Sequence, residues 1–177
     1  MSQARSSNSQ GRACETRLFK VADLVFAISF VGYENGFRLL PSFRTFARKA
    51  ADRTSLLFTL TVDDSVRPVP KARRERIREF DTGNGITVVD CLQDGGYQYI
   101  IKDVNMAECA LLIADKDFTH CRCALKGNAV MRSYGLNNAI MLAYAFAGAY
   151  KGAVLMHASV VRQGGYGYAF IAKSGTG

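Results

Sequence analysis

The sequence lacks paired cysteines, an apolar leader and a long uninterrupted hydrophobic run. None of its five cysteines belongs to a Cys-x-x-Cys pair, and their number is odd. Residues 1–17 are polar, without the apolar stretch that a secretory signal contains. Both absences fit free thiols in a reducing cytoplasm better than a secreted disulfide framework. The five thiols belong to Cys14, Cys91, Cys109, Cys121 and Cys123.

The longest apolar stretch covers residues 139–156 and barely reaches the length that a membrane span needs. Gly148, Lys151 and Gly152 interrupt it, and the Lys-Gly pair favours a helix followed by a strand over one continuous span. We therefore expect no membrane association. The sequence also contains no internal repeat and no long linker.

The composition is that of a globular protein with a basic charge balance. At 177 residues, the chain suits one domain, or one domain and part of another. Hydrophobic residues make up 49% of it, which is enough to build a core. The net charge is +8, and ten of the 23 Lys and Arg residues lie within residues 44–78.

The densest basic run, residues 71–78, allows two interpretations. One is a surface that binds nucleic acid or another anionic partner. The other is a solvated basic helix or loop. The run contains no aromatic residues on which bases would stack, so the solvated segment is favoured and nucleic acid is not the expected partner.

Hydrophobic patterns predict a β-rich first part of the chain. The segments expected as strands are residues 18–31, 55–62, 86–92, 97–102, 107–114 and 119–125. The last four follow one another at about ten-residue spacing, which is typical of an antiparallel meander. Turn residues at 93–96 predict a tight hairpin within it.

A change to helical period predicts a helix over residues 134–150, with Ser133 as its N-cap and Gly152 as its end. Because this helix is apolar nearly all round, we expect it to be buried. Residues 153–162 and 166–171 are then predicted as the two strands of a hairpin joined by a Gly-rich turn.

These elements predict an α+β (mixed α/β) fold in three parts. Residues 1–17 are expected to be a disordered tail, because they offer almost nothing to bury. Residues 18–130 would form an antiparallel, β-rich N-terminal domain. Residues 131–177 would contribute the buried helix and the opening β-hairpin of a second domain.

Two sets of polar residues outside the C-terminal segment are weak candidates for chemistry. The sequence His-Cys-Arg-Cys at 120–123 suggests a metal, but no second ligand pair follows at zinc spacing. Cys121 and Cys123 are therefore predicted as core thiols on one face of a strand. The candidate catalytic carboxylates are Asp63, Asp64 and Asp90. No motif supports them, and we interpret them as turn or surface residues.

The end of the sequence has the residue pattern of a phosphate-binding loop. A P-loop runs Gly-x-x-x-x-Gly-Lys-Ser/Thr, and in that register Ala172 takes the first glycine position and Gly177 the second. The expected strand 166–171 leads directly into it, as a P-loop requires. Backbone N–H groups of this loop would surround phosphate oxygens. They belong to Ser174, Gly175, Thr176 and Gly177.

The strand before this hairpin turn adds a histidine. Alternation along a strand places His157 and Ser159 on one face. A histidine there would reach a metal or a phosphate oxygen, and the alternative is a hydrogen-bonded core histidine.

These residues together resemble a known nucleotide-binding core. Val-Leu-Met-His-Ala-Ser-Val-Val at 154–161, a Gly-rich turn, and Tyr-Ala-Phe-Ile-Ala-Lys-Ser-Gly-Thr-Gly at 168–177 look like the core of ATP-dependent phosphoenolpyruvate carboxykinases. HPr kinase/phosphorylase, a bacterial serine kinase, shares this core and resembles the chain more closely in size before the loop. The resemblance covers about residues 135–177.

The resemblance implies a cytoplasmic, ATP-dependent kinase or phosphotransferase with Mg²⁺, a second divalent metal and a homo-oligomeric state. By position, it implies that His157 contacts metal and phosphate and that Lys173 and residues 174–177 hold the nucleotide. Ala172 departs from the P-loop glycine, and Ala158 from a family cysteine.

We expect this chain to end inside the loop, one residue before the P-loop lysine, and to be an inactive N-terminal fragment of the kinase. Its catalytic base would lie beyond residue 177. The phosphoacceptor, a protein or a small molecule, is not specified by the sequence. The alternatives are a non-catalytic binding or regulatory module and a degenerate relative without activity.

Overall fold

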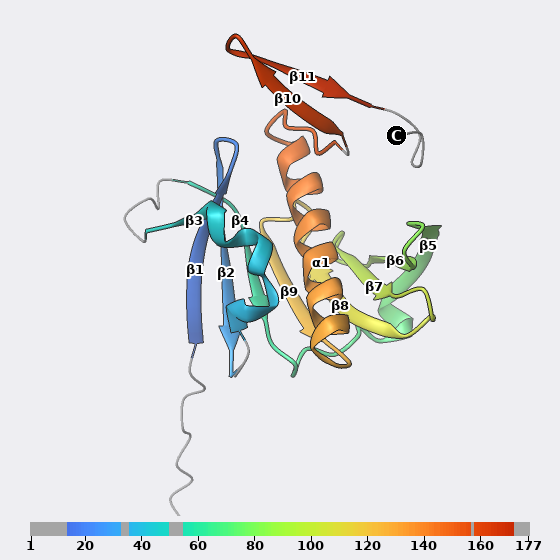
Figure 1. Cartoon of the computed structure of the whole chain (residues 1–177). Coiled ribbons are helices and arrows are strands. Elements are labelled where there is room, and N and C mark those ends of the chain that lie inside the picture. Colours follow the sequence, from blue (N-terminus) through green and yellow to red (C-terminus); the bar gives the residue numbers. More distant parts are fainter. Residues whose placement is uncertain (1–13, 33–35, 50–54, 157, 172–177) are drawn as a thin grey trace, which may run out of the picture.

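A computed structural model describes residues 14–32, 36–49, 55–156 and 158–171. The fold is mixed α+β, with one large, mostly antiparallel sheet and one long helix, α1 (Ala129–Ala149) (Figure 1). Within the described residues, no helix is both long enough and apolar enough to cross a membrane.

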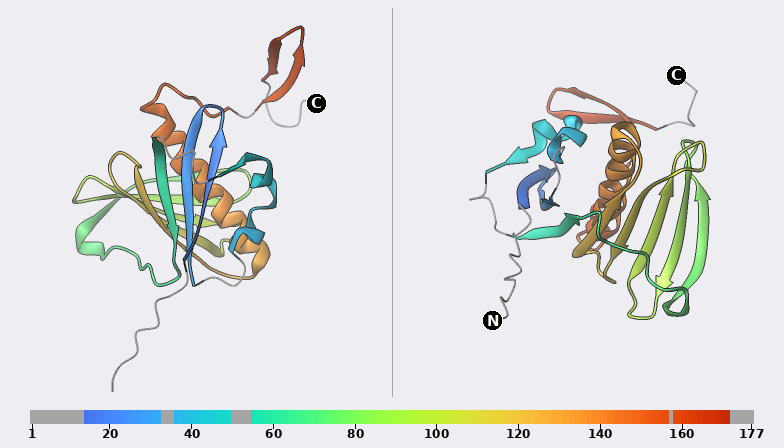
Figure 2. Two further views of the ribbon diagram at one scale, coloured as in Figure 1. Left: turned by 90° about the vertical axis from the view of Figure 1, so that its left-hand side faces the viewer. Right: turned by 90° about the horizontal axis from the view of Figure 1, so that it is seen from below.

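The large sheet has nine strands in the order β3-β1-β2-β4-β9-β8-β7-β6-β5. In chain order these are β1 (Cys14–Val21), β2 (Leu24–Val31), β3 (Ala47–Arg48), β4 (Leu56–Val62), β5 (Arg74–Asp81), β6 (Ile86–Leu92), β7 (Tyr97–Lys102), β8 (Glu108–Ala114) and β9 (His120–Leu125). The sheet curves around α1, which lies against its concave face (Figure 2).

The meander predicted from the sequence is confirmed. Strands β5 to β9 are antiparallel neighbours in chain order, and β6 and β7 are joined by the predicted turn. The sequence did not predict how β4 pairs. It lies between β2 and β9 and is parallel to both, so the first hairpin and the meander form one continuous sheet.

The first predicted strand is wrong in its extent. Residues 18–31 form parts of two antiparallel strands, β1 and β2, joined by a two-residue turn at Ala22 and Asp23. Ala22 has φ +51°, a conformation that alanine rarely adopts, so the residue type gave no sign of a turn. Strand β1 also begins at Cys14, so residues 14–17, which were assigned to the tail, pair with the end of β2.

Helix α1 and the strands share one hydrophobic core. Leu136, Ala139 and Ala143 are fully buried against the sheet. Gly135 permits the closest approach, because a Cβ there would lie 2.8 Å from the carbonyl carbon of Cys109 in β8. The helix that we placed at the start of a second domain therefore packs in the same core as the strands of the first.

The expectation that α1 is buried on all sides is wrong. The sheet covers one face, and several large apolar side chains of the helix remain exposed: Val130, Met141 and Phe146, with Tyr150 just beyond the end. The helix therefore has more hydrophobic surface than the rest of the described fold covers.

The start of α1 also differs from the prediction. The N-cap is Asn128, whose Oδ1 accepts hydrogen bonds from the backbone N–H groups of Val130 (3.0 Å) and Met131 (3.1 Å). Ser133 lies within the helix, and its hydroxyl donates to the carbonyl oxygen of Leu39 (2.8 Å). The sequence predicted that this hydroxyl caps the helix locally, but it bonds a residue that is 94 positions away in the sequence.

Replacing Asn128 by alanine is expected to lower the free energy of unfolding by about 1 kcal/mol, because two N–H groups of the first turn lose their acceptor. Urea denaturation followed by circular dichroism measures the change. Asn128→Asp keeps an acceptor at the cap and should remain near the wild type. Equal destabilisation of the two variants would contradict the capping role.

Candidate functional site

The hairpin that leads into the predicted loop is present. Strands β10 (Ser159–Gln163) and β11 (Tyr166–Phe170) form a separate two-stranded antiparallel sheet beyond the C-terminal end of α1 (Figures 1 and 2). Gly164 and Gly165, with φ +58° and +83°, make the two-residue turn that the sequence predicted. The Gly-Gly pair suits a turn that needs positive φ at both positions.

The first of these strands is shorter than predicted. It begins at Ser159 rather than at residue 153, because Ala153 still serves the end of α1. The N–H groups of Lys151 and Ala153 both donate to the carbonyl oxygen of Gly148, at 2.8 and 2.9 Å, and Gly152 between them has φ +71°. Closing the helix therefore takes Ala153, the first residue that the pattern assigned to the strand.

Every residue of both hairpin strands is exposed. The exposed apolar side chains include Val160, Val161, Tyr166, Tyr168, Phe170 and Ile171. A hairpin with apolar side chains on both faces has a surface suited to packing against further protein.

The residues on which the nucleotide prediction depends lie outside the described residues. These are His157, Ala172, Lys173, Ser174, Gly175, Thr176 and Gly177. Of the residues singled out near them, Ser159 is the first residue of β10, paired with Phe170.

Two of the three candidate carboxylates belong to turns, as predicted. Asp63 Oδ1 accepts from the N–H of Ser65 (2.8 Å), two residues on. Asp64 Oδ1 accepts from the N–H of Leu125 (3.0 Å), and its other oxygen lies 3.6 Å from Arg132 Nη1. Both carboxylates therefore hold the chain where β4 and β9 end.

Asp90 contradicts its interpretation as a turn or surface residue, because it lies within β6 and is 1% exposed. Its carboxylate accepts from Arg74 Nη1, from Arg76 Nε (2.6 Å) and from Gln98 Nε2 (2.9 Å). Gln98 in turn accepts from the N–H of Val69 (2.7 Å). Burial raises the pKa of Asp90, but the hydrogen bonds and charges of the two arginines outweigh it and hold the pKa below its ordinary value.

The basic run is a short 3₁₀ helix, η4 (Lys71–Arg73), followed by the edge strand β5. It is neither a regular helix nor a free loop, and two of its arginines are committed to Asp90. Lysines and arginines along an edge strand also oppose pairing with another sheet. Most of this charge therefore has a structural role or faces solvent.

The His-Cys-Arg-Cys segment forms the first part of β9, and the prediction of core thiols is confirmed. Cys121 and Cys123 are 2% and 0% exposed. Burial raises the pKa of Cys121 to about 12, with a smaller contribution from Asp115, so its thiol stays protonated near neutral pH. All five cysteines are free thiols. Within the described residues, no group of three His, Cys, Asp or Glu side chains could hold a metal ion.

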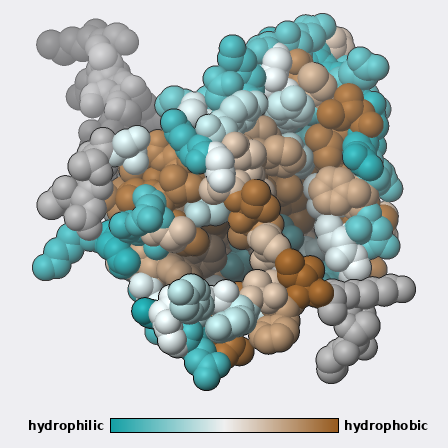
Figure 3. All heavy atoms as spheres, turned by 90° about the horizontal axis from the view of Figure 1, so that it is seen from above, coloured by the Kyte–Doolittle hydropathy of each residue, from teal (hydrophilic) through white to brown (hydrophobic). Residues whose placement is uncertain are grey.

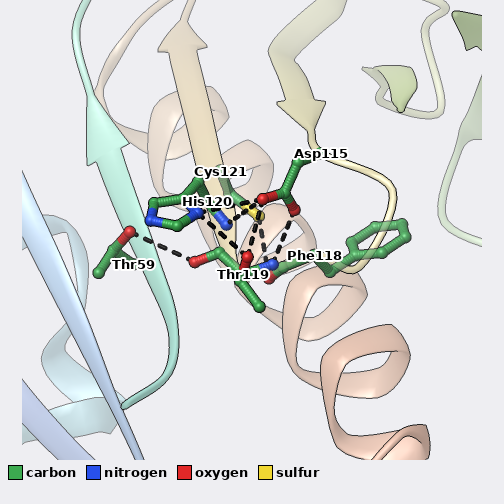
Figure 4. Close-up of polar contacts among 6 residues, drawn as sticks. All are labelled: Thr59, Asp115, Phe118, Thr119, His120 and Cys121. Carbon is green, nitrogen blue, oxygen red and sulfur yellow. Dashed lines mark hydrogen bonds and ion pairs between the residues drawn. The ribbon is translucent and has the colours of Figure 1, made fainter. Parts of the chain in front are cut away.

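A hydrogen-bonded Asp-His pair closes the turn between β8 and β9 (Figure 4). Asp115 Oδ2 accepts from Thr119 Oγ1 (2.8 Å) and from His120 Nδ1 (3.1 Å), and Oδ1 accepts from the Thr119 N–H (2.8 Å). Burial raises the pKa of Asp115, but these bonds outweigh it and lower the pKa. The His120 ring is exposed, so its other nitrogen is open to solvent.

The Asp115–His120 arrangement could position an imidazole for proton transfer. The Thr119 hydroxyl lies 3.0 Å from His120 Nδ1, but it donates to Asp115 Oδ2 within the same turn, so its proton is not directed at the imidazole. The nearest thiol, Cys121, donates to the carbonyl oxygen of Phe118 (3.7 Å) and is buried. Thr59 Oγ1 donates to the carbonyl oxygen of Thr119 (3.4 Å) (Figure 4). The pair is therefore assigned to the turn. Sequence patterns suggested a metal at residues 120–123 and did not link His120 to Asp115, because the two residues are five apart and match no catalytic motif.

Comparison with known proteins identified no relative of this chain. No family model matches the chain, and neither the curated proteins nor the solved structures contain a match. The case for a function therefore depends on the residues and their arrangement alone.

Proposed function

We propose that the protein is the first part of an ATP-dependent phosphotransferase with a phosphate-binding loop of the HPr kinase and phosphoenolpyruvate carboxykinase type. The observation that carries the proposal is the hairpin β10–β11, whose second strand leads directly into Lys-Ser-Gly-Thr-Gly at residues 173–177. A strand followed at once by a Gly-rich loop is the setting in which such loops bind phosphate.

The exposure of the hairpin supports the same proposal. Its apolar side chains are exposed on both faces, as expected of strands that belong to the core of a further unit. That unit would be the carboxykinase-like nucleotide-binding core, for which β10 and β11 are the opening strands.

The proposed roles follow the resemblance residue by residue. Backbone N–H groups of residues 174–177 would hold the phosphates, Lys173 would add positive charge, and His157 would contact the metal. ATP and Mg²⁺ are the proposed ligands, with a cytoplasmic location and a hydroxyl-bearing protein or small molecule as phosphoacceptor.

The proposal requires a lysine directly after Gly177, and Ser or Thr after it, in the protein that carries this loop. Reading the gene past the codon for Gly177 tests this directly. A different pair of residues would rule out the kinase and favour a degenerate relative or a binding module. Ala172, which replaces the first P-loop glycine, is consistent with such a relative.

Calorimetric titration with ATP and Mg²⁺ tests nucleotide binding itself. Residues 1–177 alone should show no tight binding, and the protein with the lysine should bind saturably. In the protein that contains the lysine, Gly175→Val should weaken the affinity for ATP at least tenfold, because a branched side chain blocks the approach of phosphate to the backbone. Gly164→Asn in the hairpin turn is the matched control, because a Cβ there meets nothing within 4 Å and asparagine tolerates the positive φ of +58°. Binding that Gly175→Val leaves unchanged would contradict the loop's role.

A further inference from the structure

A hollow of about 500 Å³ lies between the C-terminal half of α1 and the concave face of β5, β6 and β7. Its volume is within the range of small-molecule sites in proteins. Seen from above, the molecule is hollowed on the face at the C-terminal end of α1, and many atoms around the hollow belong to hydrophobic residues (Figure 3).

Aromatic side chains from three separate parts of the chain form its wall. Phe146 of α1 stacks on Phe118 of the β8–β9 turn, with ring centres 4.7 Å apart and an 18° angle between planes. Phe118 stacks in turn on Tyr97 of β7, at 5.6 Å and 22°. Tyr99 packs beside them, and Tyr150 stands at the rim. Such a wall presents rigid π surfaces to which a flat ring binds well.

Among the described residues, one cation faces this wall. Arg78 lines the hollow together with its neighbour Ile77, although consecutive residues of a regular strand point to opposite faces. A register shift between Arg76 and Arg78 explains this, because a bulge turns both side chains to the same side. Within the described part of the chain, the guanidinium of Arg78 makes no ion pair or hydrogen bond, unlike those of Arg74 and Arg76.

Two phenol groups also lack partners. Tyr99 is 2% exposed, yet neither its hydroxyl nor that of Tyr97 hydrogen-bonds a protein group among the described residues. Neither oxygen is among the fully buried polar atoms that lack a partner, so both are accessible to a ligand. Burial, followed by the neighbouring Tyr97 and Cys121, raises the pKa of Tyr99 above its ordinary value, so its hydroxyl remains a hydrogen-bond donor.

We propose that this hollow binds a flat aromatic carboxylate, with its ring among the aromatic side chains and its charge paired with the guanidinium of Arg78. A single cation matches a single negative charge, and a guanidinium suits a carboxylate in geometry. The phenol hydroxyls supply neutral donors to the same ligand. The proposal rests on residues 77–150 and does not depend on whether the C-terminal loop binds nucleotide.

Titration of residues 1–177 with 2-naphthoate, followed by calorimetry and by amide chemical shifts, tests the proposal. We expect saturable binding to one site, with the shifts centred on β7, the β8–β9 turn and the end of α1. Arg78→Gln should weaken naphthoate at least tenfold and leave the neutral analogue 2-naphthamide almost unchanged. Tyr150→Ala, at an exposed position that the fold does not need, should weaken both compounds.

Arg38→Gln is the matched control, because Arg38 is exposed, is outside the hollow and has no recorded ion pair among the described residues. It should bind naphthoate like the wild type, and thermal unfolding should show all three variants folded. The proposal is overturned by absent binding, by binding that Arg78→Gln and Arg38→Gln affect equally, or by shifts confined to the β10–β11 hairpin. Displacement of naphthoate by adenosine monophosphate would assign the hollow to a nucleotide and overturn it as well. Dimerisation through this face without naphthoate binding would assign it to a second copy.

Discussion

Replacing Asp90 by alanine is expected to lower the free energy of unfolding by about 3–5 kcal/mol. The carboxylate is buried and accepts from Arg74, Arg76 and Gln98, and Gln98 is itself 0% exposed. Without Asp90, the guanidinium of Arg74 stays largely buried with no counter-charge, and its Nε already has no partner among the described residues. Urea denaturation measures the loss.

Asp94→Ala is the matched control for charge. Asp94 is an exposed turn residue, and its carboxylate accepts one backbone hydrogen bond, from Gly96. Its loss is expected to cost about 1 kcal/mol. Similar losses for Asp90→Ala and Asp94→Ala would show that the buried cluster contributes no more than an ordinary turn contact.

The same cluster predicts a dependence of stability on pH. The pKa of Asp90 is lower in the folded state than its ordinary value near 3.9. Its contribution is therefore complete above about pH 4 and is lost as the pH falls from there through the folded-state pKa. The pKa of Asp115 is also lowered, by hydrogen bonds from Thr119 and His120 that outweigh burial, so its contribution to stability changes with pH in the same direction. The difference in unfolding free energy between the wild type and Asp90→Asn should accordingly shrink below pH 4, which isolates Asp90.

Gly85→Ala is expected to destabilise the protein by about 3 kcal/mol or more, from overpacking together with backbone strain. Gly85 has φ +144°, and a Cβ there would collide with the carbonyl oxygen of Lys102 and approach the Tyr134 hydroxyl to 2.9 Å. Neither can yield easily, because Lys102 belongs to β7 and the Tyr134 hydroxyl donates to the carbonyl oxygen of Asn84 (2.8 Å).

Gly83→Ala, in the same turn, separates the two causes. Gly83 also has positive φ (+78°), but a Cβ there would meet nothing within 4 Å. Gly83→Ala should therefore lower the free energy of unfolding only through backbone strain, by about 1 kcal/mol. If thermal or urea denaturation showed equal losses at the two glycines, close packing between the β5–β6 turn and α1 would not be the reason for glycine at residue 85.

Local sequence was enough to predict elements whose partners are close in the chain. The strands of the meander, β6 to β9, and the hairpin β10–β11 were identified because alternating apolar residues and turn glycines act over about ten residues. All of α1 after its first five residues, 134–149, was identified by its helical period. The ends of the elements were less predictable. Asn128 and Ser133 are both suitable N-cap residues, and only the tertiary structure decides which of them caps the helix.

The aromatic hollow shows why the candidate sites were harder to predict. Arg78, Tyr99, Phe118 and Phe146 come from four separate elements or turns, and no local pattern links residues so far apart in the sequence. The burial of Asp90 has the same origin, because its partners come from β5 and β7 and its strand looks like any other half-polar strand.

The sequence by itself determined the meander, the C-terminal hairpin, the core thiols and the Gly-rich loop pattern on which the kinase proposal depends. Tertiary structure alone decided that Ala22 and Asp23 turn the first strand back, that β4 joins two antiparallel parts by parallel pairing, and that α1 keeps an exposed apolar face. The physical reason is the range of the interactions. Period and turn chemistry act between near neighbours, whereas strand order, burial and the closing of a hollow depend on contacts between residues distant in the chain.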